Sequence, residues 1–329
     1  MKRWGLLALG VAALATATSA NAEPPYKLTL AGLGPTGLLA TVHTGIAAAV
    51  ATAYPGSTVT YQTSAGGFAN LVMVEQKKVP LGFAVDSEVQ LGLQGRKPFK
   101  SKLNNVRTIG FVVGWVPMHL VVTKSFADKH GLKDFSDIAK KKPPIRMALQ
   151  TRANVVSMLS EAMLKEIGVT PADIRSWGGQ VIYIRGSEQA PLMADRRTDM
   201  MFNMTPVKGR VATAVGKARE VVMLTVDKGL IDRVAKKMGA TTILIPKTAY
   251  KWLDFDMHTL SLGVAIMGHK DMADQTAFNL AKAFVERIDK IKAVHPFIRK
   301  LTPEYIASMK IGQYHPGAAR YYKSVGLMK

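Results

Sequence analysis

Hydrophobic and polar residues alternate in the segment 27–30, and a nearly continuous apolar segment follows at 38–53. Alternation with a period of two predicts a half-buried strand, and an apolar segment of this length predicts a buried helix. The sequence GLGPTG at 32–37 predicts a turn between them, with Thr36 as the N-cap of the helix. The first N–H groups of a helix have no partner within it and carry partial positive charge, so this unit could hold a carboxylate or a phosphate.

The same design recurs in the next part of the chain. A strand at 58–62 is followed by the turn TSAGG at 63–67 and a helix at 68–77, and a strand at 81–85 ends at Asp86. Strands that alternate with helices indicate parallel pairing, and ligands collect at the carboxyl ends of such strands. The sequence therefore predicts that three turns meet at one edge of a sheet.

A second lobe is predicted because the pattern restarts after residue 117. Two strands flank an extended break at 114–117, which we interpret as a crossing between lobes. The predicted elements from there on are strands at 119–123, 145–149, 181–185, 200–203 and 258–267, a turn at 150–154, and helices at 155–167 and 271–292. We expect an α/β protein with one lobe formed by residues 23–116 and 259–329, the other by 117–258, and closure about Gly114 and Ser261 over a cleft between them.

The first 22 residues have the form of a signal peptide. Lys2 and Arg3 precede an apolar stretch at 4–17, and Ala20-Asn21-Ala22 has the small residues that a signal peptidase accepts. We predict cleavage after Ala22 and export to the periplasm. The apolar stretch is shorter than the roughly 20 residues that span a bilayer, which argues against a membrane anchor.

Composition and charge exclude further kinds of site and partner. The 329 residues are 48% hydrophobic, which is typical of globular proteins, and include no cysteine, so no disulfide or cysteine-bound metal is possible. The formal net charge is +21, which could indicate nucleic acid binding. However, the basic residues are dispersed and the only short run is at 140–142. We expect attraction of small organic anions and no nucleic acid partner.

The turn at 32–37 also satisfies the GxGxxG pattern of dinucleotide-binding proteins. Such a unit needs an acidic residue about 20 positions on to hold the ribose, and no acidic residue occurs between Glu23 and Glu75. A GxSxG motif is absent, and the seven histidines have no metal-ligand spacing. We expect His43 to be bonded within the protein. We therefore expect a protein that is not an enzyme and binds neither a cofactor nor a metal.

Arg152 is the strongest candidate for ligand binding. A cation at the start of a helix opposes the helix dipole, so its position calls for a compensating anion, although a solvated arginine is the plainer alternative. Asp86 and Glu188 could bind a ligand ammonium group or cap their helices. Phe68, Trp115 and Phe202 could form apolar walls or belong to the core. The predicted ligand-binding residues are Gly34, Thr36, Gly37, Ser64, Ala65, Gly66, Asp86, Trp115, Thr151, Arg152, Ser187, Asn203 and Thr205.

Five segments together resemble one family of binding proteins. They are GLGPTG at 32–37, TSAGGFANL at 63–71, VRTIGFVVGWVPMHLVV at 106–122, FNMTP at 202–206 and HPGAARYYKSVG at 315–326. The chain resembles the TAXI solute-binding proteins of TRAP transporters along nearly all of its predicted mature part. The resemblance implies a type II periplasmic binding protein fold. It also implies a receptor that delivers a carboxylate, such as a dicarboxylate or an acidic amino acid, to membrane subunits.

Two departures from that family fall in the expected cleft. The first turn of the family usually carries a pair of aromatic residues and a proline after the glycines, whereas this chain has LLATVH at 38–43. The turn at 150–154 reads QTRAN where the family is rich in glycine and serine. We therefore expect a receptor whose ligand can differ from that of its relatives. We also expect the receptor to be a monomer. The alternatives are a ligand-sensing adaptor for a signalling partner and, less favoured, a nucleotide-cofactor enzyme.

Overall fold

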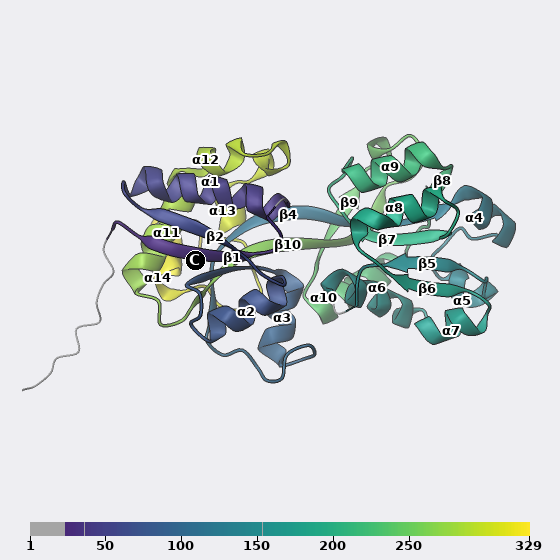
Figure 1. Ribbon diagram of the computed structural model, residues 1–329, viewed down its shortest axis with the longest axis horizontal. Helices are drawn as coiled ribbons and strands as arrows, with labels where there is room; N and C mark the ends of the chain where they lie inside the picture. Colours follow the sequence, from purple (N-terminus) through teal and green to yellow (C-terminus); the bar gives the residue numbers. More distant parts are fainter. Residues whose placement is uncertain (1–23, 36, 153) are drawn as a thin grey trace, which may run out of the picture.

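The computed structural model describes residues 24–35, 37–152 and 154–329, which form two lobes side by side (Figure 1). In each lobe, helices cover both faces of a sheet. Two long strands, β4 (Val106–Thr123) and β10 (Met257–His269), run from one lobe into the other. The ten strands pair in the order β2-β1-β3-β10-β4-β7-β5-β6, with β8 on β4 and β9 on β10. The predicted arrangement of two α/β lobes is confirmed.

In the first lobe, β1 pairs in parallel with both β2 and β3, and β10 then pairs antiparallel with β3 and β4. The remaining strands of this lobe are β1 (Lys27–Gly32), β2 (Thr58–Thr63) and β3 (Leu81–Val85). The helices are α1 (Leu38–Ala53), α2 (Gly67–Glu75), α3 (Asp86–Gln94), α11 (Asp274–Glu286), α12 (Ile288–Ala293), η2 (Pro296–Lys300), α13 (Pro303–Ile306) and α14 (Pro316–Ser324).

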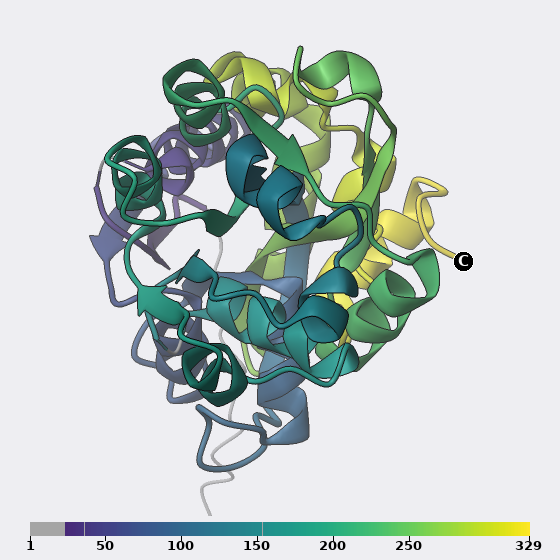
Figure 2. The ribbon, with the colours of Figure 1, turned by 90° about the vertical axis from the view of Figure 1, so that its right-hand side faces the viewer.

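The second lobe is seen end-on in Figure 2, with its helices around the strands. Its strands are β5 (Arg146–Leu149), β6 (Gln180–Tyr183), β7 (Met200–Met204), β8 (Val221–Met223) and β9 (Thr241–Ile245). Its helices are α4 (Lys124–His130), α5 (Asp137–Lys141), α6 (Val155–Glu166), α7 (Pro171–Ser176), α8 (Gly186–Ala194), α9 (Arg210–Ala218), α10 (Lys228–Met238) and η1 (Lys247–Ala249). The exact division into 23–116 with 259–329 and 117–258 stays a prediction.

The predicted break at 114–117 is wrong, because β4 is one strand of 18 residues. Its pairing with β10 continues through the crossing, with register shifts on both sides of Val264. Trp115 takes a left-handed conformation, with φ of 62°, yet the strand continues through it. The residues that suggested a break thus lie at an irregularity inside a continuous strand.

The predicted long helix at 271–292 is also wrong, since α11 and α12 meet at Arg287. No glycine or proline marks this position in the sequence. α12 packs so closely on α1 that a Cβ added to Gly45 would lie 2.8 Å from Ile291 Cα. The interruption at Arg287 thus precedes a helix that packs tightly on α1, a tertiary contact that the hydrophobic period does not record.

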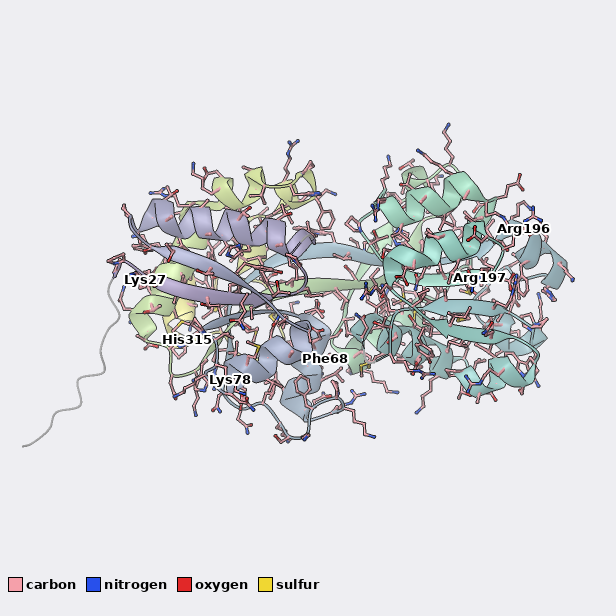
Figure 3. All side chains as sticks on the ribbon, viewed as in Figure 1. Lys27, Phe68, Lys78, Arg196, Arg197 and His315 are labelled. Carbon is pink, nitrogen blue, oxygen red and sulfur yellow. The ribbon has the colours of Figure 1, made fainter. Side chains whose placement is uncertain are left out.

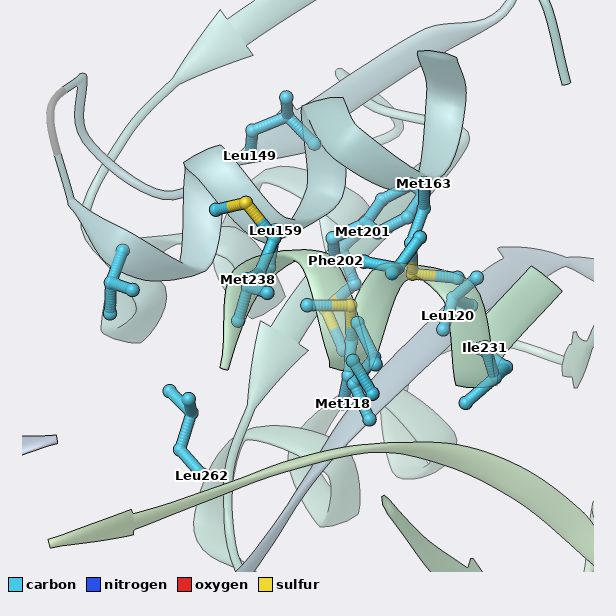
Figure 4. Close-up of a cluster of buried hydrophobic side chains, with 14 of the residues drawn as sticks. Met118, Leu120, Leu149, Leu159, Met163, Met201, Phe202, Ile231, Met238 and Leu262 are labelled. Atoms are coloured by element: carbon cyan, nitrogen blue, oxygen red, sulfur yellow. The ribbon is translucent and has the colours of Figure 1, made fainter. Parts of the chain in front are cut away.

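Apolar side chains fill both lobes. Figure 4 shows part of the second lobe's core, where Met201 and Phe202 of β7 lie among side chains of α6 and β4, while Leu262 of β10 lies apart. The C-terminal sequence HPGAARYY serves the first lobe's core, because Tyr322 is fully buried and its hydroxyl donates to the Ile109 carbonyl at 2.7 Å. Gly317 is needed there, since an added Cβ would lie 1.9 Å from the Asp274 carbonyl oxygen.

Candidate functional site

A cavity of about 680 Å³ lies between the two lobes. Residues of the first lobe and of the second both line it, and β4 and β10 contribute Val113, Val116, Leu262 and Val264. This volume is within the range that small-molecule sites occupy. The cavity is thus the candidate ligand site, and we refer to it as the interlobe cavity.

The three turns of the first lobe meet at the interlobe cavity, as predicted. They contribute Gly34 and Gly37, then Ala65 and Gly66, and then the end of β3 at Val85. The N-cap of α1 is Gly37, so the prediction of Thr36 in that role is wrong, and Thr36 itself lies outside the described residues. The N-caps of α1 and α2, Gly37 and Gly66, both line the cavity, so no N-cap side chain lies between the cavity and the first backbone N–H groups of these helices.

Arg152 and Thr151 line the interlobe cavity from the second lobe. Arg152 was expected at the start of a helix but lies two residues before the N-cap of α6, which is Asn154. The Asn154 Oδ1 accepts from the Val156 N–H at 2.8 Å. The Arg152 guanidinium lies 3.9 Å from the centre of the Tyr183 ring, a cation–π contact that orients it. Within the described residues no carboxylate lies within 4.0 Å of this cation. Its N–H groups are therefore available to a ligand.

Glu88 is a lining residue that sequence reasoning missed. Its carboxyl lies beside Gly67 at the start of α2, and Oε2 accepts from the Val85 N–H at 3.0 Å. Burial raises the pKa of Glu88 to about 7. The available signal was a glutamate three residues after the end of a strand, the spacing of a capping box, which indicates a structural role. Near neutral pH this carboxyl is poised between its neutral and charged forms.

Three other predicted residues of the first lobe lie outside the lining. The Ser64 hydroxyl accepts from the Gly66 N–H at 3.0 Å and contacts the Gly32 carbonyl, so it holds the second turn together. The Asp86 carboxylate accepts from the Ser87 N–H at 2.8 Å and from the Gly263 N–H at 3.0 Å, and burial raises its pKa well above the usual range. The Trp115 ring contacts the Tyr305 ring, with 4.5 Å between ring centres and 32° between ring planes, and both Trp115 and Asp86 line a separate cavity of about 580 Å³.

The remaining predicted residues of the second lobe form or adjoin a hydrogen-bonded cluster. Asn203 is buried, and its amide donates to the Gly186 carbonyl at 3.0 Å and to Gln189 Oε1 at 2.9 Å. Thr205 is buried next to Gly209, whereas Ser187 and Glu188 are exposed on α8. None of these four residues lines the interlobe cavity; within the described residues the structure brings Gly34, Gly37, Ala65, Gly66, Thr151 and Arg152 together there.

Most of the cavity wall is apolar. Phe68 lies on α2, on the side of the first lobe that faces the second (Figure 3). Phe202, the other aromatic candidate, is instead fully buried against Phe135 at 5.8 Å between ring centres. His43 does not line the cavity either. Its Nε2 contacts the Val59 carbonyl at 2.7 Å, and burial lowers its pKa. The expectation that His43 is bonded within the protein is confirmed.

A family model described as the NMT1-like family matches residues 31–326. The chain belongs to the NMT1-like family. No curated protein matches its sequence. The described part contains no helix that is both long and apolar enough to cross a membrane. The predicted signal peptide lies outside the described residues.

Solved structures of periplasmic binding proteins share the fold of this NMT1-like family member. MatC from Rhodopseudomonas palustris, with bound malate, has a TM-score of 0.53 at 12% identity over 84% of this chain and 90% of its own. BugD has a TM-score of 0.51 at 13% identity over 93% and 100%. A TctC solute-binding protein from Polaromonas, without ligand, has a TM-score of 0.51 at 12% identity over 83% and 88%. These likenesses confirm the predicted α/β fold of two-lobed periplasmic binding proteins.

Proposed function

We propose that this protein is a periplasmic solute-binding receptor that captures a small organic anion in the interlobe cavity. It presents the closed form to the membrane subunits of a secondary transporter, of the TRAP type that the TAXI resemblance implies, and it acts as a monomer without catalysing a reaction. The observation that carries this proposal is the position of Arg152, whose guanidinium has no carboxylate partner among the described residues and lines a cavity that both lobes share.

The chemistry of the cavity favours a carboxylate. A guanidinium can donate two parallel N–H groups to one carboxylate, and each charge-assisted hydrogen bond contributes about 1.5–3 kcal/mol. The start of α1 lies on the first-lobe wall, where N–H groups without helical partners favour negative charge. The start of α2 also lines the cavity, but the Glu88 carboxyl already lies beside it. Micromolar affinity corresponds to about −8 kcal/mol, which a few such bonds in a closed cavity can supply after the costs of association.

The comparisons also favour a carboxylate ligand, although they do not identify the ligand of this chain. Among the similar folds, the MatC structure contains malate, which is a carboxylate. The wide dispersion of basic residues and the net charge of +21 also favour attraction of anions. Cleft closure about β4 and β10 would remove the bound anion from water and give the membrane subunits a form that they can distinguish from the empty receptor.

The first test is to identify the ligand and then remove the cation. Mass spectrometry of the compounds released from denatured, purified protein should reveal a small organic acid. Arg152→Ala should weaken calorimetric binding of that acid at least tenfold, about 1.4 kcal/mol, since one charge-assisted contact is lost. Arg197→Ala, which removes an exposed arginine outside the cavity lining, serves as the matched control and should change affinity less than twofold. Release of a nucleotide cofactor, or equal effects of the two substitutions, would contradict the proposal.

A further inference from the structure

The described wall of the interlobe cavity carries only two ionisable side chains, and they are of opposite type. Among its described lining residues, Arg152 is the one cation and Glu88 the one carboxyl. Thr151 and Asn154 are the only other described lining residues with polar side chains, and the Asn154 oxygen already accepts from the Val156 N–H. The described wall therefore offers one strong position for a negative charge and no second cation.

The rest of the wall consists of large apolar side chains from both lobes. They include Leu38, Leu39, Phe83, Val155, Val156 and Met204. Leu33 also lines the cavity, and 43% of it is exposed, a large fraction for an apolar side chain of the described residues. Burying such a side chain against an apolar ligand is favourable, at roughly 25 cal/mol for each Å² removed from water.

Together these two observations define a narrower ligand class. The inference drawn from them rests on the proposed receptor function. We propose that the interlobe cavity takes monocarboxylates with an uncharged apolar body, such as a fatty, branched or aromatic acid, in preference to dicarboxylates and amino acids. The carboxylate binds Arg152 from the second lobe and the N–H groups at the start of α1 from the first, and the apolar body contacts the leucine and valine side chains of both lobes.

Each excluded class carries a further charge for which the described wall offers few partners or none. The second carboxylate of a dicarboxylate would face apolar side chains or the Glu88 carboxyl, and an unpaired charge in such surroundings is costly. The ammonium group of an amino acid has three donors to satisfy. Among the described lining side chains, only those of Glu88 and Thr151 keep an oxygen free to accept from it, and Glu88 already uses Oε2 for the Val85 N–H.

The test compares three acids of equal chain length by calorimetry on the purified mature protein. Octanoate is the monocarboxylate, octanedioate adds a second carboxylate, and 2-aminooctanoate adds an ammonium group. We expect octanoate to bind at least tenfold more tightly than either of the others. From butanoate to octanoate, affinity should rise about fourfold for each added methylene, the equivalent of about 0.8 kcal/mol.

A matched pair of substitutions separates the loss of a contact with the ligand's apolar body from a general effect of replacing an exposed leucine with asparagine. Leu33→Asn should weaken octanoate binding three- to tenfold and butanoate binding less than twofold, because only the longer acid reaches the side chain. Leu244→Asn changes a leucine that is 50% exposed and lies outside the cavity, and it should leave both affinities unchanged.

The outcomes distinguish this inference from the proposal on which it rests. Tighter binding of octanedioate or of 2-aminooctanoate, lost in Arg152→Ala, would overturn the preference for apolar monocarboxylates and leave the anion receptor in place. Equal effects of Leu33→Asn and Leu244→Asn would also overturn the inference. Absence of binding for all three acids and for the acid released from the purified protein would overturn both.

Discussion

Arg152 and Glu88 show how far single residues can be interpreted from sequence. Arg152 is recognisable because a cation near a predicted helix start needs an anion. The ring that Arg152 contacts, Tyr183, lies on β6, which follows α6 in the sequence. No sequence pattern near Arg152 therefore indicates this contact. Glu88 resembles a capping residue in sequence, and only the folded chain places it in the interlobe cavity.

The raised pKa of Glu88 predicts how stability depends on pH. The folded state retains this proton up to a pH of about 7, whereas an ordinary glutamate loses it near 4.5. The free energy of unfolding should therefore fall as pH rises through this interval, by up to about 3 kcal/mol from this group, and Asp86 contributes with the same sign. Urea unfolding between these pH values should show a smaller fall for Glu88→Gln.

Glu304→Gln is the control for this prediction. Its exposed carboxyl has a lowered pKa because it is hydrogen-bonded to the Thr302 side chain, so its substitution should leave the slope between about pH 5 and 7 unchanged. If Glu88→Gln has the same slope as the wild-type protein, the Glu88 carboxyl is charged throughout and its assignment is wrong.

At the scale of elements, the strand–turn–helix units and the place of the crossing could be predicted, whereas the continuity of β4 through the crossing could not. Alternation and glycine turns predict β1, β2 and β3 with their helices, and parallel pairing follows from their order. The residues at 114–117 indicate a break because Gly and Pro are unusual in a strand. Pairing with β10, whose Gly263 N–H donates to Asp86, keeps β4 continuous there.

The left-handed conformation of Trp115 predicts an unusual order of stability at the crossing. Glycine adopts a positive φ at little cost, whereas alanine loses about 1 kcal/mol there. Trp115→Gly should therefore be more stable than Trp115→Ala by about 1 kcal/mol in urea unfolding. The reverse order is expected at Thr242, an exposed residue of β9 without a positive φ, where glycine weakens the strand. Greater stability of Trp115→Ala than of Trp115→Gly would refute a left-handed crossing.

At the scale of the whole molecule, the two-lobed architecture could be predicted because each lobe repeats one simple pattern and the chain crosses twice. The composition of the cleft could not, because its wall combines Leu33, Phe83, Val155 and Met204 from segments far apart in sequence. Apolar residues at such positions are equally typical of a core. The sequence thus pointed to Arg152, Phe68 and the segment 38–43 as parts of the cleft, whereas the other apolar residues of the wall could not be told from core residues.

The central claim is that the lobes close over an organic anion held by Arg152. The chain has no cysteine, so Ala48→Cys on α1 and Ala214→Cys on α9, both exposed, provide a single labelled pair across the two lobes. Electron–electron double resonance should show a distance shorter by at least about 2 Å when the identified acid saturates the protein, and no shortening in Arg152→Ala. An unchanged distance at a ligand concentration that calorimetry shows to be saturating would contradict the account.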